Sequence, residues 1–247
     1  MMYNPFSLEG KTILVTGASS GIGRAIAVEC SRMGATIVLN ARNEKRLNDT
    51  FNMLVQGNHT QIIGDITQSD IQKKIADQCP ILQGVVLCAG IVKTVPFKFI
   101  TEDVLLNLTN TNFFSPMLLT KELLRKKKIE KSASIVFISS INAYCVSTGN
   151  GIYSATKGAM NSMAKTLAWE VSSLKIRVNC VLPAMVKTKL IDDVTITQEE
   201  LVADQAKYPL GYGEPEDVAY AVIYLLSDAA KWITGSEFII DGGVRLS

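Results

Sequence analysis

Short apolar runs alternate with longer amphipathic stretches along the whole chain. The short runs are rich in β-branched residues, which is typical of strands that are buried on both faces of a parallel sheet. Each run is followed by a stretch long enough for a helix, so the pattern predicts repeated βα units. We therefore expect an α/β fold of the Rossmann type, a doubly wound parallel sheet of about seven strands with helices on both faces.

The same pattern predicts the boundaries of the elements. Strands are expected at 12–16, 36–40, 60–63, 84–88, 134–139, 176–181 and 237–240. Helices are expected at 21–33, 44–54, 69–78, 102–128, 152–173 and 215–226. Because no linker or internal repeat divides the chain, residues 1–247 are expected to form a single domain. Residues 189–208 interrupt the alternation at the rim where α/β sheets bind ligands, and are a candidate substrate lid.

A glycine-rich turn follows the first predicted strand and leads directly into a helix. It reads Thr16-Gly17-Ala18-Ser19-Ser20-Gly21-Ile22-Gly23. Glycines allow a tight turn and a close approach of the backbone, and the N-terminus of a helix offers free N–H groups to a pyrophosphate. Glycine is also common in ordinary turns, but the strand before it and the helix after it favour a dinucleotide site. The predicted contacts are Gly17, Ser19, Ser20, Gly21, Ile22 and Gly23.

The end of the second predicted strand bears on the choice of nicotinamide cofactor. Dinucleotide folds that use NAD commonly place an acidic residue here, which binds the ribose 2′-hydroxyl. This chain has Ala41 at that position and Arg42 directly after it. A carboxylate would repel a 2′-phosphate, whereas a guanidinium binds it by paired charge-assisted hydrogen bonds. The sequence therefore favours NADP(H), the alternative being that Arg42 is a solvated charge at the start of a helix.

Three side chains suited to proton transfer are predicted at the same edge of the sheet. Tyr153 and Lys157 are four residues apart on a predicted helix, so they project from one face. A nearby ammonium, together with positively charged nicotinamide, would lower the pKa of a phenol from its ordinary value of ~10. Any helix can carry this pair, but Ser140 follows an apolar strand at the end where such sheets bind ligands. The three residues together predict a catalytic site.

These motifs resemble the short-chain dehydrogenase/reductase family, in its branch of single-domain members of this length. The resemblance covers nearly the whole chain and implies reversible hydride transfer between nicotinamide and a carbonyl or alcohol substrate. Its landmarks, in order, are the spacing T-G-x-x-x-G-x-G, Asp65, Ala89-Gly90, Asn112, Ser140, Tyr153 with Lys157, 183–188 and Asp241-Gly242-Gly243.

The resemblance gives the catalytic residues their roles. It implies that Tyr153 donates a proton to the carbonyl oxygen, or removes one from the alcohol, and that Ser140 hydrogen-bonds that oxygen. Lys157 would hold the nicotinamide ribose and tune Tyr153, and Asn112 would keep a water in a proton relay to Lys157. The neighbouring Asn110 and Ser139 are rivals for two of these roles, and the family spacing favours Asn112 and Ser140.

The resemblance also implies further contacts with the cofactor. Asp65 would accept a hydrogen bond from the adenine amino group, and the backbone of Val186 and the hydroxyl of Thr188 would bind the carboxamide. The alternatives are a turn residue at Asp65 and a helix cap at Thr188. The other expected contacts are Ile66, Ala89, Gly90, Tyr153, Lys157 and Pro183.

The chain departs from the family pattern at three positions near the site. Cys88 stands where an asparagine is usual, Ala184 where a glycine is usual, and Tyr212 where an arginine is usual. The first removes a side-chain hydrogen bond, and the second would be strained if that position requires a positive φ. None removes a catalytic group, so we expect an active enzyme with altered local geometry.

Composition and charge narrow the remaining possibilities. With 247 residues, 47% hydrophobic and 19% charged, the composition is globular. A net charge of +2 gives no reason to expect binding to nucleic acid or an anionic membrane. One histidine and five cysteines without C-x-x-C spacing argue against a metal site. Because neither a signal sequence nor an apolar run of about 20 residues is visible, we expect a cytoplasmic protein.

The sequence says less about the substrate than about the reaction. The overall pattern is most similar to β-ketoacyl-[acyl-carrier-protein] reductases, and the basic run 125–128, with Lys131, is a candidate docking site for an acidic carrier. The same run also suits a solvated helix end, and Leu174 replaces an arginine of that branch. The alternatives are a sugar, a steroid or another small alcohol or ketone as substrate, and a non-catalytic dinucleotide-binding protein.

The resemblance further implies a homotetramer, paired through the helices at 102–128 and 152–173 and through the C-terminal strand. The catalytic helix supports this, since it carries apolar or small residues on more than one face. These residues are Ala155, Ala159, Met160, Met163, Leu167 and Trp169.

Overall fold

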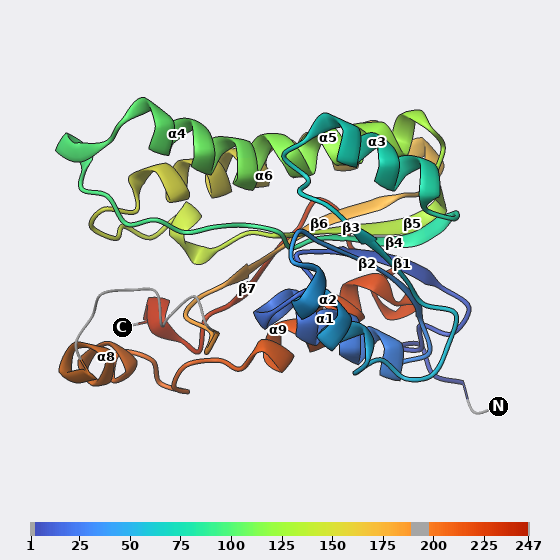
Figure 1. The fold of residues 1–247 in the computed structure, drawn as a ribbon. Helices are drawn as coiled ribbons and strands as arrows, with labels where there is room; N and C mark the ends of the chain where they lie inside the picture. The colour runs from blue at the N-terminus through green and yellow to red at the C-terminus, as the bar shows by residue number, and fades with distance from the viewer. Residues whose placement is uncertain (1–2, 189–197, 247) are drawn as a thin grey trace.

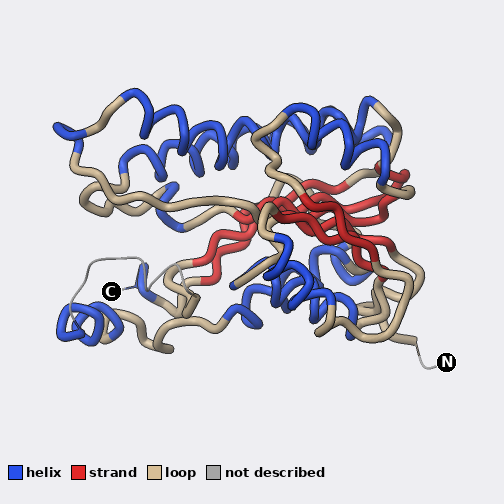
Figure 2. The backbone as a smooth tube through the Cα atoms, in the orientation of Figure 1, coloured by secondary structure: helices blue, strands red, loops and turns tan. Residues whose placement is uncertain are grey.

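Seven parallel strands form the centre of the molecule, in the order β3-β2-β1-β4-β5-β6-β7 (Figures 1 and 2). The computed structural model describes residues 3–188 and 198–246. The strands are β1 (Thr12–Thr16), β2 (Thr36–Ala41), β3 (Thr60–Ile63), β4 (Leu82–Leu87), β5 (Ile129–Ile138), β6 (Arg177–Pro183) and β7 (Glu237–Ile240). All neighbouring pairs are parallel, and the direction of winding changes between β1 and β4. The predicted doubly wound parallel sheet is confirmed.

Helices cover both faces of this sheet. Figure 1 shows α3, α4, α5 and α6 on one face and α1, α2 and α9 on the other. Side chains alternate along each strand, so Ile135 and Phe137 of β5 enter the core under α5 and α6, while Val136 and Ile138 enter the core under α1 and α9. The helices are α1 (Gly21–Arg32), α2 (Glu44–Phe51), α3 (Ser69–Gln78), α4 (Glu102–Thr109), α5 (Ser115–Arg125), α6 (Gly151–Glu170), α8 (Gln198–Gln205) and α9 (Pro215–Leu226). Short turns of helix are η1 (Phe97–Phe99), η2 (Asn110–Phe114), η3 (Ile141–Ala143), η4 (Ser172–Leu174), η5 (Asp228–Ala230) and η6 (Val244–Leu246).

The strand β5 begins earlier than predicted. Its first residue, Ile129, pairs with Leu82 of β4, five positions before the predicted start at 134. Glu130 and Lys131 are exposed, and Ser132 has a φ of 66°. The apolar run therefore marks only the buried part of this strand.

The helix predicted at 102–128 is interrupted. Its two parts, α4 and α5, are joined by the π turn η2, and α5 ends at Arg125. Pro116 has no N–H to donate to the preceding turn, and Ser115 Oγ donates to Asn110 O at 2.6 Å. π turns are frequent at functional sites, and this one carries Asn112.

The predicted lid at 189–208 contains an element that the sequence did not predict. Its second half forms α8, and Tyr212 Oη, in the loop before α9, donates to Asp204 Oδ2 at 2.7 Å. Residues 189–197 lie outside the described residues. A lid function for this segment stays a prediction.

The carboxylate of Glu237 links the edge strand β7 to α6 and to the turn after β5. It accepts hydrogen bonds from Tyr144 Oη and, at 3.2 Å, from Asn161 Nδ2, and it forms an ion pair with Lys165. Asn161 and Lys165 continue, at four-residue steps, the face of α6 that carries the predicted catalytic pair. Because Tyr144 lies four residues after Ser140, a single carboxylate fixes α6 against the turn that holds Ser140.

We expect Glu237→Gln to lower the free energy of unfolding by about 1–3 kcal/mol at neutral pH, because the network loses its anion. Burial alone would raise the pKa of Glu237, but hydrogen bonds from Lys165 and Tyr144 lower it below its ordinary value. A pKa that is lower in the folded state stabilises the protein above the unfolded value of ~4.3, and this stabilisation is lost as the pH falls through the folded value. In urea unfolding, the difference between wild type and Glu237→Gln should therefore shrink below a pH of about 4.

Asp77→Asn is the matched control for this series. Asp77 forms an exposed ion pair with Lys126, so its loss should change the free energy of unfolding by less than about 1 kcal/mol. A loss on Glu237→Gln that is as large at acidic pH as at neutral pH would contradict an ionic role for Glu237.

Candidate active site

A cavity of about 510 Å³ opens at the carboxyl ends of the strands, where the direction of winding changes. The predicted residues that line it come from the turns after six different strands and from α6. Of the predicted site residues, the cavity is lined by Gly17, Ser19, Ser20, Gly21, Ile22, Gly23, Arg42, Asp65, Ile66, Ala89, Gly90, Ser140, Tyr153, Lys157, Pro183 and Thr188. Asn112 and Val186 are buried outside its lining.

The glycine turn is packed against the turn that follows β4. Gly17 has a φ of +67°, and a Cβ there would lie 2.8 Å from Cα and N of Ala89. A Cβ on Gly23 would lie 2.3 Å from the carbonyl oxygen of Gly17. Thr16 Oγ1 accepts hydrogen bonds from the N–H of Cys88 at 3.1 Å and of Ala89 at 3.3 Å. This packing brings the backbone to the cavity wall beside the start of α1, the arrangement that a pyrophosphate requires.

Arg42 and Asp65 lie beside one another at the ends of β2 and β3. Arg42 Nη1 is 3.6 Å from Asp65 Oδ2, and the Arg42 side chain is 69% exposed. Asp65 also accepts hydrogen bonds from Thr67 N and Oγ1, each at 2.9 Å. Burial alone would raise the pKa of Asp65, but the Thr67 hydrogen bonds and the Arg42 charge lower it, so Asp65 is ionised at neutral pH. The structure thus places a guanidinium at the cavity wall, as the sequence predicted.

The predicted catalytic residues meet at the opposite end of the cavity. Lys157 is 5% exposed, and its Nζ donates to Ile138 O at 2.8 Å. The same Nζ lies 5.6 Å from the centroid of the Tyr153 ring. Ser140 Oγ accepts from Asn142 N at 3.2 Å and donates to Pro183 O at 3.5 Å, and it is close enough to the Tyr153 hydroxyl to lower the pKa of Tyr153. An ammonium, a phenol and a hydroxyl therefore converge on one point.

Burial dominates the acid–base behaviour of this group. It raises the pKa of Tyr153 to about 12, against a smaller lowering by the hydrogen bond from Ser140. It lowers the pKa of Lys157 to about 8. The lowering of the Tyr153 pKa by Lys157 together with a charged nicotinamide concerns the complex with the cofactor and stays a prediction, while in this structure desolvation of the phenolate is the largest influence on that pKa. The Tyr153 hydroxyl keeps its proton at neutral pH and is able to donate it.

The structure separates the predicted residues from their rivals. Ser139 Oγ donates to the backbone oxygen of Lys157 at 3.4 Å, whereas Ser140 is the serine that acts on Tyr153 by lowering its pKa. Asn110 is exposed, whereas Asn112 is fully buried. The geometry therefore favours Ser140 and Asn112, as the family spacing does.

Asn112 holds the loop that follows β4. Its Nδ2 donates to Ile91 O at 2.9 Å, and its Oδ1 accepts from Ile91 N at 2.8 Å. A Cβ on Gly90 would lie 3.2 Å from Asn112 Oδ1 and 3.8 Å from Lys157 Nζ, so Gly90 lies between Asn112 and the lysine. Both polar atoms of the Asn112 side chain are thus committed to the loop, and its role in a water relay stays a prediction.

The three departures from the family pattern have distinct consequences. Cys88 lines the cavity as a neutral thiol, because burial raises its pKa to about 12. Ala184 has a negative φ and donates its N–H to Ile240 O at 2.9 Å, so the strain considered from the sequence does not arise. Tyr212 is buried, packs edge-on against Tyr208 at 5.0 Å between ring centroids, and anchors α8 through Asp204.

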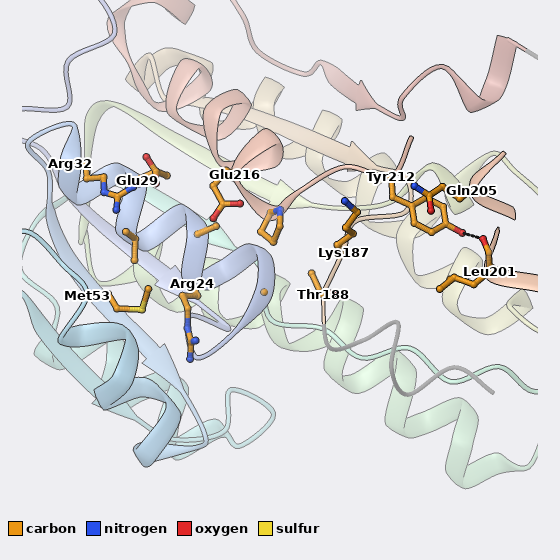
Figure 3. A pocket seen from close by; sticks show the side chains of 14 residues that line it. Arg24, Glu29, Arg32, Met53, Lys187, Thr188, Leu201, Gln205, Tyr212 and Glu216 are labelled. Carbon is orange, nitrogen blue, oxygen red and sulfur yellow. Dashed lines mark hydrogen bonds and ion pairs between the residues drawn. The ribbon is translucent and has the colours of Figure 1, made fainter. Parts of the chain in front are cut away.

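A second cavity, of about 570 Å³, lies between α1, α8 and the start of α9 (Figure 3). It shares Gly21 and Thr188 with the first cavity. Arg24, Lys187 and Glu216 project from its walls, while Ser140, Tyr153 and Lys157 line only the first cavity. The second cavity therefore lies outside the reacting centre.

Neither a metal site nor a membrane-spanning helix is found among the described residues. In residues 3–188 and 198–246, no group of three or more His, Cys, Asp or Glu side chains is placed to hold a metal ion. No helix in that part of the chain is long and apolar enough to cross a membrane.

Comparison with known proteins identifies the family. A family model described as "Enoyl-(Acyl carrier protein) reductase" matches residues 17–245. A 3-oxoacyl-[acyl-carrier-protein] reductase of Rickettsia felis is 34% identical over 241 residues, which cover 97% of this chain and 98% of that protein. A putative NAD(P)-dependent gluconate 5-dehydrogenase of Beutenbergia cavernae, solved with NADP at low occupancy, has a TM-score of 0.90 at 26% identity and covers 99% of this chain and 100% of its own.

A second solved structure has the same architecture with its cofactor bound. A putative 2-deoxy-d-gluconate 3-dehydrogenase of Agrobacterium tumefaciens with bound NADP has a TM-score of 0.90 at 27% identity, covering 99% of this chain and 100% of its own. The doubly wound parallel sheet agrees with these matches. The chain belongs to the short-chain dehydrogenase/reductase family of oxidoreductases.

Proposed function

We propose that this oxidoreductase transfers hydride between nicotinamide and a carbonyl/alcohol pair, with Tyr153 as the general acid and base. The observation that carries the proposal is the convergence of Ser140, Tyr153 and Lys157 in the cavity that also contains the glycine turn. A non-catalytic dinucleotide-binding protein would not require a buried lysine beside a half-buried phenol, because burying a charged group costs free energy and such groups cluster at functional sites.

The geometry supports a simple division of roles. The substrate oxygen would lie between the hydroxyls of Ser140 and Tyr153, where Ser140 orients it and Tyr153 donates its proton. With a pKa of about 8, Lys157 is mostly charged at neutral pH and stabilises the phenolate that forms when Tyr153 gives up its proton. The nicotinamide, when bound, supplies or accepts the hydride. Lys157 is 5% exposed, and its burial strengthens its electrostatic interaction with the phenolate.

The cofactor is NADP(H). The two related structures that contain NADP support this, and so does the guanidinium of Arg42 at the cavity wall. We assign the pyrophosphate to the glycine turn, the adenosine to Asp65, Ile66, Ala89 and Gly90, and the nicotinamide to the side of Tyr153 and Lys157. The backbone near Pro183 and Val186 and the hydroxyl of Thr188 are assigned to the carboxamide.

We favour a 3-oxoacyl thioester as the substrate, because a 3-oxoacyl-[acyl-carrier-protein] reductase is 34% identical over nearly the whole chain. The similarity to two gluconate dehydrogenases favours a sugar acid as the second candidate. A panel of 3-oxoacyl thioesters and keto sugar acids, assayed with NADPH, distinguishes the two.

The basic run 125–128 does not lie at the active-site mouth of its own chain. Lys128 directly precedes β5, whereas Ser140 follows the end of that ten-residue strand, ~33 Å away. Lys126 and Arg125 are paired with Asp77 and Glu122. The interpretation of this run as a carrier-docking site at its own active-site mouth is therefore wrong, because the strand separates the two ends of the sheet.

We also propose that the chain acts as one dinucleotide-binding and catalytic domain, in the cytoplasm, as a homotetramer. Exposed apolar side chains on α4, η2, α5 and α6 support the tetramer, since a face of this kind is usually covered by a partner. They are Leu105, Leu106, Phe114, Leu118, Met163 and Trp169. Trp232, 96% exposed, gives similar support near the edge strand β7.

We expect Tyr153→Phe to lose turnover by a factor of about 10²–10⁴ while it still binds NADPH, because the ring still packs and only the hydroxyl is lost. NADPH oxidation over the carbonyl panel measures turnover, and fluorescence titration measures binding. Tyr220→Phe is the matched control, since Tyr220 is exposed on α9 and should turn over normally. Near-normal turnover of Tyr153→Phe would refute the proposed mechanism.

The tetramer is tested by light scattering at micromolar protein concentration. We expect a mass of four chains, and Trp169→Glu should lower it, because a charge on an apolar contact face opposes its burial. Lys175→Glu is the control, because Lys175 is close to Trp169 in sequence but is already a polar, exposed residue. This variant should leave the mass unchanged. A monomeric wild-type mass would remove the proposal.

A further inference from the structure

Three arginines gather where the glycine turn meets the start of α2. Arg42 and Arg46 line the cofactor cavity, together with Ser19 and Asn43. Arg24, on α1, lies behind them. The hydrogen bonds of the three guanidinium groups differ, and the difference indicates which of them is available to a ligand.

The guanidinium of Arg24 is committed to the protein. Its Nε donates to Thr50 Oγ1 at 3.0 Å, and its Nη2 donates to Ser19 O at 2.7 Å and to Arg46 O at 3.4 Å. These bonds tie the backbone of the glycine turn to the backbone of α2. Arg24 is therefore a positioning residue, which holds two walls of the cavity together.

The guanidinium of Arg42 is shared with a carboxylate. Asp65 Oδ2 lies 3.6 Å from Arg42 Nη1, and hydrogen bonds from Thr67 help to keep the pKa of Asp65 below its ordinary value. A phosphate that binds Arg42 must compete with this carboxylate, or share the guanidinium with it. Part of the attraction of Arg42 for an anion is thereby offset.

The guanidinium of Arg46 forms neither a hydrogen bond nor an ion pair with any residue in the described part of the chain, while its backbone is fixed on both sides. Its N–H donates to Asn43 Oδ1 at 2.9 Å, and its carbonyl accepts from Thr50 Oγ1 at 3.2 Å and from Arg24. Arg42, two residues before α2, and Arg46, on α2, both line the cofactor cavity. A doubly charged anion bound at this wall would be attracted by both guanidinium groups.

We propose that Arg46 is a second ligand for the 2′-phosphate of NADP(H), and that it sets the preference over NAD(H) together with Arg42. The proposal rests on the cofactor given under the proposed function. Arg46, which is exposed on α2, would contact the phosphate directly. Asp65 would compete with the phosphate for Arg42. Because the contact is at the surface, the preference should weaken as ionic strength rises.

The test is a binding titration that does not depend on turnover. Fluorescence gives the dissociation constants of NADPH and NADH, and calorimetry gives those of 2′,5′-ADP and 5′-AMP, which isolate the phosphate. Arg46→Ala should weaken NADPH and 2′,5′-ADP on the order of tenfold, the effect of one charge-assisted contact, and leave NADH and 5′-AMP nearly unchanged. Arg42→Ala should behave similarly, and the double variant should lose the preference.

Lys45→Ala is the matched control. Lys45 carries the same charge one residue away, is exposed, and lies outside the lining of the cofactor cavity. Its removal should change the affinity for either nucleotide by no more than about twofold. Arg46 is itself exposed, so its substitution should not disturb folding.

Each alternative outcome overturns a defined part of the proposal. If wild type prefers NADPH but Arg46→Ala behaves like Lys45→Ala, Arg46 is not a phosphate ligand and the NADP(H) assignment stands. If Arg46→Ala weakens NADPH and NADH equally, the residue acts on the cavity as a whole, and the specific role is refuted. A wild type that prefers NADH would refute both the cofactor assignment and the role of Arg46.

Discussion

The cavity depends on the close contact between two turns, the one after β1 and the one after β4. At Gly17 a side chain would collide with the backbone of Ala89, and at Gly23 it would collide with the carbonyl of Gly17. Thr16 closes the same contact by accepting two backbone N–H groups. A Cβ at Gly17 would force the two turns apart, and a Cβ at Gly23 would distort the first of them, so their backbones would no longer form a continuous wall. The spacing of the glycines is thus a steric requirement of the sheet as well as a binding motif.

Burial sets the chemistry at the other end of the cavity. Desolvation opposes charge on both Tyr153 and Lys157, so it raises the pKa of the phenol and lowers that of the ammonium. The two shifts have opposite effects on reduction, since a protonated phenol is a ready donor while a lysine that has lost its proton no longer stabilises the phenolate. Proton transfer is therefore best supported below a pH of about 8, where both groups hold their protons.

The sequence predicted the sheet from its buried apolar runs. It predicted the cavity residues from motifs of fixed spacing and from the family that these motifs resemble. The start of β5 was missed, because Glu130 and Lys131 are exposed and carry no apolar signal. The π turn was missed because a helical pattern continues across it, although Pro116 marks the lost hydrogen bond. The effect of burial on the pKa of Tyr153 was not foreseen, since a sequence shows the neighbouring charge but not the depth of burial.

Cofactor choice and chemistry are placed in regions with different physical constraints. Ser140 and Lys157 are buried at the ends of β5 and within α6, where substitution disturbs packing as well as activity. Arg42, by contrast, is exposed on the loop that leads to α2, so its replacement changes charge with little effect on the core. Selectivity between nucleotides can therefore change in this fold without loss of stability. The end of the cavity that holds Ser140 and Lys157 tolerates fewer substitutions, because these side chains also belong to the packed interior.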